Sequence, residues 1–392
     1  MRIANLAFPL LAVALTAQSG LWSQGCPWAG VRTPGTAGPA NDPSAGYATQ
    51  LIPATPGLKV RIRAEFPHVR YLSWTLYDGN WTLVSALADR DITPSKGRNP
   101  FVPGTPRDGN SLGAYELTVM VGPQPANPAS NTLYIDPAKV PGDTFPLIYR
   151  IYLVDRARTA GSKDTLGGLA LPEVQFYRPD GQPYCPDAAA ARETLARIWS
   201  RSVPRPAPAS LERARGEAAN PPLWWHSGKD TVSLFKGANE GAVYLGSRIS
   251  SAHGPFLVFR WKAPRTPVET FDGKPFPAEE EMRFWSLVFN SPEGTGERSL
   301  QDVEVPVLPN GYRQLVVGFN GVGRPEFVPE RQWVGLKLAE ARLTLRYMQA
   351  AIGYRGNLSR LPAGEVPAEL RDIVPGGTYC NAGQLRELLG RR

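Results

Sequence analysis

The sequence predicts an all-β protein with two tandem antiparallel β-sandwich or jelly-roll domains and a short helix after each. The first reason is an internal duplication, in which like residues recur 197 positions apart in the 392-residue chain. The pairs at this spacing are Tyr47 and Tyr244, Arg63 and Arg260, Pro67 and Pro264, and Tyr115 and Tyr312. The second reason is a series of short alternating segments separated by turns rich in Gly and Pro. Repeats of this length are whole domains rather than solenoid units.

The spacing changes within the repeat. Arg70 and Ser73 recur as Arg283 and Ser286, 213 positions later, which predicts an insertion of 16 residues in the second copy. The segment 268–281 has the Pro, Gly and acidic residues expected of it. After the insertion, Arg150 recurs as Arg346 at a spacing of 196. The dipeptide Tyr184-Cys185 recurs as Tyr379-Cys380 at a spacing of 195.

Apolar and polar residues alternate over 58–66, which predicts a strand with one buried and one wet face. The next strand buries Leu72, Trp74 and Leu76, whereas Trp81 falls in the turn DGNWT and is expected to be exposed. Further strands are expected at 115–121 and 147–154 and, in the second copy, at 312–319 and 343–348.

Helices are expected at 186–200, which begins with Pro and Asp and is rich in Ala, and at 382–392. The sequence therefore divides into a first sandwich domain at 20–185, a helix and Pro/Ala/Arg linker at 186–236, and a second sandwich domain with its C-terminal helix at 237–392.

Residues 1–19 have a basic start, an apolar stretch and small residues at the end, which predicts a cleaved secretory signal too short to span a bilayer. We therefore expect a secreted or periplasmic protein with no transmembrane segment in the mature chain. The chain has three cysteines, Cys26, Cys185 and Cys380, and any of the three pairings is open. Cys26 follows SQG, which is a poor lipoprotein box.

The chain is basic, with a formal net charge of +8 and a pI near 9.4. A nucleic-acid site would gather these charges into a patch, yet Lys and Arg are spread along the chain without a run of five. No nucleic-acid partner is expected.

Several segments resemble a family of uncharacterised exported bacterial proteins. They are the WS and YD of RYLSWTLYD, NTLY at 131–134, LIYRIYLVD and GGLALPEV. The C-terminal β-sandwich domain of that family carries a similar strand, an Asn-x-Leu-Pro step and an LR-x-Y-x-P strand. Here Tyr134 stands in place of the Pro, and Val154-Asp155 replaces the Pro-containing exit. The resemblance implies a jelly-roll-like fold and an envelope location, and it transfers no catalytic residue.

Few residues offer chemistry. GNSLG around Ser111 matches the pattern of a hydrolase nucleophile elbow, but a strand follows the Ser where a helix is needed, so a turn is favoured. The three His residues cannot form a His-rich metal site, and no cofactor is expected. His68, at a strand entry, is the best acid–base candidate, although a hydrogen-bonded turn is the simpler interpretation. Asp155 and Asp164 could hold calcium but fit no known loop pattern.

Aromatic residues suggest a ligand site. Trp81 near Asp78, with Trp224 and Trp225 at the entry to the second copy, could stack on a carbohydrate or a small molecule. Alternatively, these Trp side chains fill the interface between the domains.

The repeated pairs Arg63 and Arg260, and Arg150 and Arg346, are expected on the wet faces of their strands, and Ser73 and Ser286 face away from the apolar stripe. A face lined by Arg, Ser and Tyr could form a ligand groove, or Arg–carboxylate pairs that tie strands together.

The sequence thus favours an exported, duplicated β-sandwich protein with a binding or scaffolding role in the bacterial envelope. The alternative is a hydrolase or lyase acting on extracellular polysaccharide, with Asp78 and Asp91 near His68. Such a mechanism needs two carboxyl groups about 5–10 Å apart across a cleft.

Overall fold

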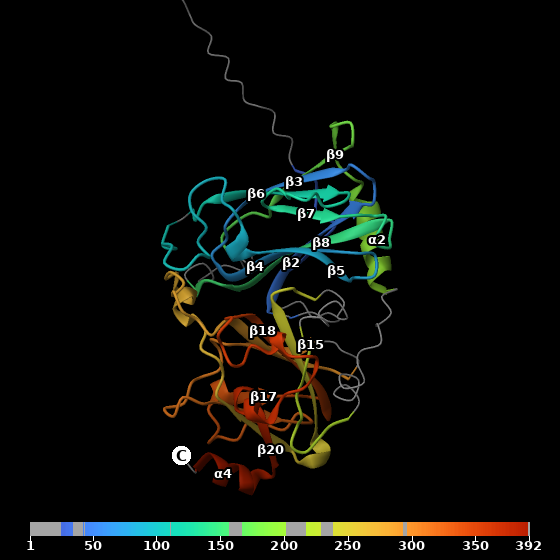
Figure 1. The fold of residues 1–392 in the computed structure, drawn as a ribbon. Helices are drawn as coiled ribbons and strands as arrows, with labels where there is room; N and C mark the ends of the chain where they lie inside the picture. The colour runs from blue at the N-terminus through green and yellow to red at the C-terminus, as the bar shows by residue number, and fades with distance from the viewer. Residues whose placement is uncertain are drawn as a thin grey trace, which may run out of the picture.

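The computed structural model describes residues 25–33, 42, 44–109, 111–156, 167–200, 217–228, 238–292 and 296–390. Four sheets form two β-sandwiches stacked one on the other (Figure 1). The predicted all-β fold is confirmed. The signal-peptide prediction concerns residues that lie outside this description.

In the first sandwich, one sheet has the order β1-β2-β8-β4-β5 and the other β10-β9-β3-β6-β7. The strands of the first sheet are β1 (Gly30–Arg32), β2 (Ala45–Pro53), β8 (Thr144–Val154), β4 (Val69–Tyr77) and β5 (Leu83–Ala88). Those of the second are β10 (Pro183–Tyr184), β9 (Glu173–Tyr177), β3 (Lys59–Glu65), β6 (Ala114–Val121) and β7 (Thr132–Ile135). All neighbours are antiparallel except β6 and β7.

In the second sandwich, the sheet orders are β15-β14-β18-β12-β11-β19 and β17-β16-β13-β20. The first sheet contains β15 (Gly296–Gln301), β14 (Met282–Asn290), β18 (Glu340–Ala350), β12 (Ala242–Ser250), β11 (Trp225–His226) and β19 (Gly364–Glu365). The second contains β17 (Trp333–Gly335), β16 (Arg313–Gly318), β13 (Phe256–Trp261) and β20 (Gly376–Cys380).

The two sandwiches share one topology. The order β2-β8-β4-β5 corresponds to β12-β18-β14-β15, and β9-β3-β6-β7 corresponds to β20-β13-β16-β17. Equivalent strands therefore keep equivalent neighbours through both copies, as the sequence duplication predicts.

Strand register corrects two of the sequence matches. Because Arg63 matches Arg260, the next residues Ala64 and Trp261 are equivalent. Tyr115 pairs with Ala64 and Arg313 pairs with Trp261, so Tyr115 corresponds to Arg313 and not to Tyr312. Likewise β20 takes the position of β9, so Cys380 corresponds to Tyr177 rather than to Cys185. The repeated Tyr-Cys pair is therefore a coincidence of sequence.

Each sandwich has its own apolar core between its two sheets. Leu72, Trp74 and Leu76 of β4 lie in the first core, and Trp285, Leu287 and Phe289 of β14 lie in the second, as predicted. The Trp74 indole also donates a hydrogen bond to the Tyr115 hydroxyl at 3.0 Å, which satisfies its buried N–H group.

Both predicted helices form, as α2 (Ala188–Ser200) and α4 (Ala382–Gly390), but they cover different sheets. Leu195 of α2 packs near Leu51 of β2, whereas Leu385 of α4 packs on Phe256 and Val258 of β13. The two helices therefore occupy different places in the two copies.

The insertion of the second copy reaches into the first sandwich. It starts with a short 3-10 helix (Val268–Asp272), and Phe276 beyond it joins the first core at 1% exposure. Its ring lies 5.8 Å from that of Phe101, and its carbonyl accepts a hydrogen bond from the Gly104 N–H group. The insertion therefore fastens the two sandwiches together.

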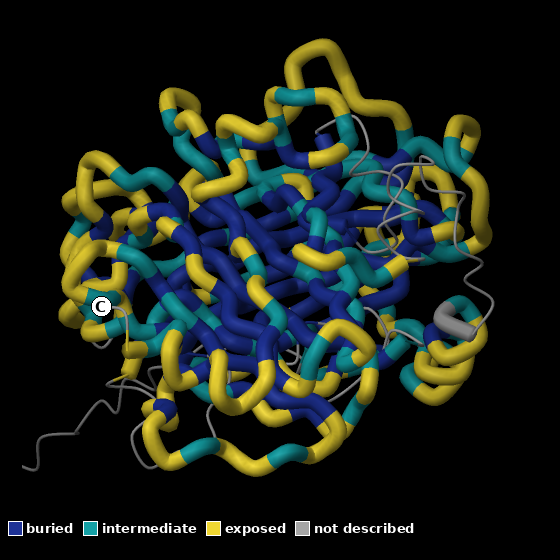
Figure 2. Tube along the Cα trace, turned by 90° about the horizontal axis from the view of Figure 1, so that it is seen from below, coloured by how far each residue is buried: buried dark blue, intermediate teal, exposed yellow. Residues whose placement is uncertain are grey.

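The sheet that contains β4 and the sheet that contains β14 pack face to face, and we call them the inner sheets. Both β4 and β14 are therefore buried along their whole length. Figure 2 shows buried segments in the middle of the molecule with exposed loops around them. The apolar part of the contact combines equivalent residues from both copies: Ala45 with Ala242, Tyr71 with Phe284, and Tyr152 with Met348. The interface therefore has approximate twofold symmetry.

One packing prediction is wrong. Trp81 is fully buried, because its side chain lies against Tyr77 beneath the region covered by α2, with ring centroids 5.7 Å apart. A turn in the sequence is not an exposed turn when its side chain joins an apolar cluster with a distant helix, here with Leu195 of α2.

Trp81→Ala is accordingly expected to lower the free energy of unfolding by about 3–5 kcal/mol, similar to Trp74→Ala, because both remove a large buried ring. Chemical denaturation of the two variants beside the parent measures this. A loss for Trp81→Ala below half of that for Trp74→Ala would contradict the packing.

Candidate functional site

His68, the acid–base candidate, directly precedes β4 and is buried, with 3% exposure. Its Nδ1 lies 3.8 Å from an oxygen of Asp155, and Arg107 donates to both oxygens of the same carboxylate at 3.1 and 3.2 Å. Arg107 also donates to the Val69 carbonyl. The carboxylate therefore serves an internal ion pair, which indicates a structural role for this group of residues.

Asp78 forms the turn that holds Trp81. Its Oδ1 accepts hydrogen bonds from the N–H groups of Asn80 and Thr82, both at 2.8 Å, and its carbonyl accepts one from Trp81. Trp81 adopts a left-handed backbone with φ of 65°. The carboxylate thus stabilises the turn, as Asp commonly does.

Trp224 and Trp225 are buried as well, at 4% and 8% exposure. The Trp224 indole lies in the second core and donates to the Pro375 carbonyl at 2.8 Å, while Trp225 and His226 form β11. Burial lowers the pKa of His226. The ligand-stacking interpretation needs exposed rings and is therefore wrong for Trp224 and Trp225, because the lead-in segment is a strand of the second sandwich.

The interface between the sandwiches is organised by two equivalent loop residues, Asp42 and Asn239. The Asp42 carboxylate accepts hydrogen bonds from Ser286 at 2.5 Å and Ser299 at 2.8 Å, and it pairs with Arg346 at 3.3 Å. Thus each loop contributes a polar side chain to the other copy, since Asn239 bonds to groups of the first sandwich.

The Asn239 contacts repeat this pattern in the opposite direction. Its amide donates to Ser73, the equivalent of Ser286, at 3.2 Å and accepts from the Tyr71 hydroxyl at 2.9 Å. The backbone N–H groups of Asp42 and Asn239 donate to the hydroxyls of Tyr47 and Tyr244, respectively.

A second reciprocal pair lies beside the first. Arg70 of β4 pairs with Asp302 at 2.9 Å, and its equivalent Arg283 of β14 lies 3.5 Å from Asp89. All four side chains are at most 1% exposed.

The sheet faces that carry Ser73, Arg150 and their equivalents are thus filled by the partner sandwich, and Arg–carboxylate pairs do tie the structure together. Arg63 lies on the other sheet of the first sandwich.

Asp42→Asn tests this network through its pH dependence. Burial by itself would raise the pKa of Asp42, but Arg346 and the hydrogen bonds from Ser286 and Ser44 outweigh it and lower that pKa. A carboxyl group with a lowered folded pKa stabilises fully above its unfolded pKa of about 3.9 and loses this contribution as the pH falls through the folded value.

We therefore expect Asp42→Asn to lower the free energy of unfolding by about 3 kcal/mol at pH 7, because it leaves Arg346 buried without its carboxylate. The deficit should shrink as the pH falls from about 4 through the lower folded pKa of Asp42, because the carboxylate of the parent then becomes protonated. Denaturation at both pH values, with the exposed Asp108→Asn as control, measures this. An equal deficit at both would contradict the ion pair.

The first sandwich has one sheet face that no described element covers, at the top of Figure 1. We call it the outer face. Register places its residues in three rows across the strands. The rows are Tyr177, Lys59, Met120 and Tyr134; Gln175, Arg61, Thr118 and Thr132; and Glu173, Arg63 and Glu116. All of them are half-buried or exposed.

Ion pairs fix part of this surface. Glu116 accepts from Arg61 at 2.8 Å and from Arg63 at 3.2 Å. The hydrogen bond and charge of Arg61, together with Arg63, lower the pKa of Glu116. These pairs are exposed and contribute little to stability, about 0–1 kcal/mol each. Their effect is to hold the side chains in place.

The equivalent face of the second sandwich is apolar and covered. Phe256 and Val258 stand where the first copy has Lys59 and Arg61, and Val316 stands in place of Thr118. They pack against Leu385, Leu388 and Leu389 of α4. The two copies thus use the same face in opposite ways, one as a core and one as a polar surface.

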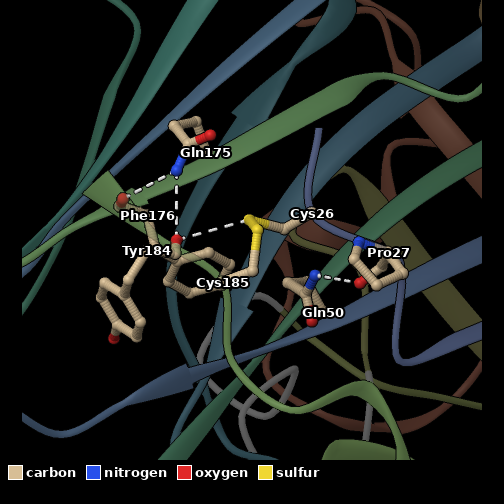
Figure 3. Close-up of a disulfide and its surroundings, with 7 residues drawn as sticks. All are labelled: Cys26, Pro27, Gln50, Gln175, Phe176, Tyr184 and Cys185. Atoms are coloured by element: carbon tan, nitrogen blue, oxygen red, sulfur yellow. Dashed lines mark hydrogen bonds between the residues drawn. A yellow bond between two sulfur atoms is a disulfide. The ribbon is translucent and has the colours of Figure 1, made fainter. Parts of the chain in front are cut away.

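The disulfide strengthens one edge of the outer-face sheet. Cys26 bonds to Cys185, next to β10 (Figure 3). The Cys26 N–H group donates to the Val174 carbonyl of β9. The Gln175 amide in turn donates to the Tyr184 carbonyl at 3.1 Å. Cys380 is a buried free thiol, and the bonded Cys26 is not a lipid-attachment site in this structure. A disulfide is typical of an oxidising, extracytoplasmic compartment.

An open groove of about 520 Å³ continues the third row of the outer face. Arg63, Glu116 and Glu173 border it on one side, and Lys96 and Leu171 also line it. It carries both signs of charge over an apolar floor, which suits a ligand that donates and accepts hydrogen bonds.

Ser111 and Asp164 are the remaining candidates. Ser111 lies in a loop directly before β6, so the strand follows it as the sequence suggested. Asp164 lies outside the described residues. Among those described, no group of three or more His, Cys, Asp or Glu side chains could hold a metal ion, and no helix is long and apolar enough to cross a membrane.

The sequence contained one signal for the outer face that residue motifs alone did not reveal. Aligning the copies puts Lys59 and Arg61 opposite Phe256 and Val258. This contrast between repeats marks a face that is wet in one copy and buried in the other.

One solved bacterial structure shares this fold, and a second is similar to a lesser degree. An uncharacterised protein from Burkholderia cenocepacia matches 86% of this chain and 79% of its own at 15% identity, with a TM-score of 0.52. The VPA0106 protein from Vibrio parahaemolyticus matches 88% of this chain and 91% of its own at 12% identity, with a TM-score of 0.46. No protein-family model matches the chain, and no curated protein matches it either. The first similarity shows a shared fold and carries no activity.

Proposed function

We propose that this protein is an exported binding module of the bacterial envelope, secreted or periplasmic, whose outer face on the first sandwich is its ligand surface. The domain division at 20–185 and 237–392 belongs to the same proposal. The observation that carries it is the contrast between copies. The fold covers this sheet face with α4 in the second sandwich and leaves it polar and open in the first.

The inner-sheet faces that could otherwise bind a ligand are occupied. The inner sheets face each other, and their Arg, Ser and Tyr side chains bond across the interface. The hydrolase or lyase alternative relied on His68 with Asp78 and Asp91, but His68 and Asp78 are 3% and 4% exposed and each is engaged in a structural contact. These residues give catalysis no support.

The test is a binding screen of the mature full-length chain against envelope polysaccharides, peptidoglycan fragments, lipid vesicles and small metabolites. Thr118→Trp places a bulky side chain in the middle of the outer face, and Arg298→Trp on exposed β15 is the matched control. We expect at least one ligand class that binds the parent and the control and is lost with Thr118→Trp. Binding that survives Thr118→Trp, or no binding by the parent, would contradict the proposal.

A further inference from the structure

We infer that the outer face binds an extended acidic polysaccharide that runs across the strands, along the first row of side chains. This inference rests on the proposed function and names its ligand. The candidate site consists of Tyr177, Lys59, Met120 and Tyr134, supported by the second row beside it.

Tyrosine rings lie at both ends of the first row. Tyr177 is on β9 and Tyr134 on β7, with Lys59 and Met120 on the two strands between them. Adjacent strands are about 4.8 Å apart, so the two Tyr positions are separated by about 14 Å, roughly the length of a short oligosaccharide. A half-exposed Tyr offers an apolar ring on which a sugar can stack and a hydroxyl that can bond to it.

The charge between the rings is positive. Lys59 is exposed and has no ion-pair partner among the described residues, and Arg61 in the adjacent row is the only other charged side chain of the first two rows. Arg61 pairs with Glu116 at 2.8 Å and also interacts with the Tyr177 hydroxyl. The acidic residues begin in the third row, with Glu173 and Glu116.

A carboxylate on the sugar chain would therefore meet Lys59 directly and a fixed guanidinium beside it. Thr118, Thr132 and Gln175 in the second row add neutral hydroxyl and amide groups that suit sugar hydroxyls. The net charge of +8 favours encounter with a polyanion. In the second sandwich the Tyr134 position is Gly335 and the Lys59 position is Phe256, so the site belongs to the first copy.

Binding of the full-length chain to polygalacturonate, with dextran as the neutral comparison, tests the inference by titration calorimetry at low and high salt. We expect binding to polygalacturonate that weakens with salt, and little binding to dextran. Lys59→Gln should weaken it about tenfold, the usual effect of losing a charge-assisted hydrogen bond. Tyr134→Ala should weaken it to a similar degree.

Lys262→Gln and Tyr312→Ala, half-exposed or exposed positions of the second sandwich, are the matched controls and should bind as the parent does. Equal binding of dextran and polygalacturonate, or unchanged affinity in Lys59→Gln, would overturn the inference. Capture by anionic lipid vesicles without polysaccharide binding, blocked by Thr118→Trp, would overturn it while leaving the proposed function intact. Failure to bind any probe would overturn both.

Discussion

The reciprocal buried polar contacts between the two sandwiches are the constraint on which the rest of the structure depends. Asp42 of the first copy reaches Ser286 and Arg346, and Asn239 of the second reaches Ser73. Buried charges are tolerated only when they are paired and hydrogen-bonded. Separating the sandwiches would break the contacts of Arg70 with Asp302 and of Arg283 with Asp89, and it would also expose the apolar part of the interface to water, so each copy stabilises the other.

This dependence determines which surfaces remain for function. The inner sheet of each sandwich is used by the interface, and α4 uses the outer sheet of the second. The outer face of the first sandwich is the remaining sheet face, and the Cys26–Cys185 bond and the Arg61–Glu116–Arg63 contacts keep it ordered. The second sandwich therefore has both of its sheets covered, whereas the first keeps one sheet face open.

Sequence patterns predicted what depends on local periodicity. Alternation placed Trp74 inward, composition located α2 and α4, and constant spacing revealed two equal folds. Sequence patterns did not predict burial correctly where a side chain is covered by a segment distant in the sequence. The turn at Trp81 lies under the region covered by α2, and β11 completes a sheet in what was expected to be a lead-in. Alternation also cannot distinguish a face in water from one that packs on a second domain, which is why Arg150 and Arg346 were placed on a wet face yet are buried.

The most direct measurement is equilibrium unfolding of the full chain in urea, followed by both Trp fluorescence and far-ultraviolet circular dichroism. Because the buried ion pairs and Phe276 cross between the sandwiches, the two should unfold together. One transition with coincident curves from the two probes is expected. Two well-separated transitions in the parent protein would show that each sandwich is stable alone and would contradict the interdependence of the copies.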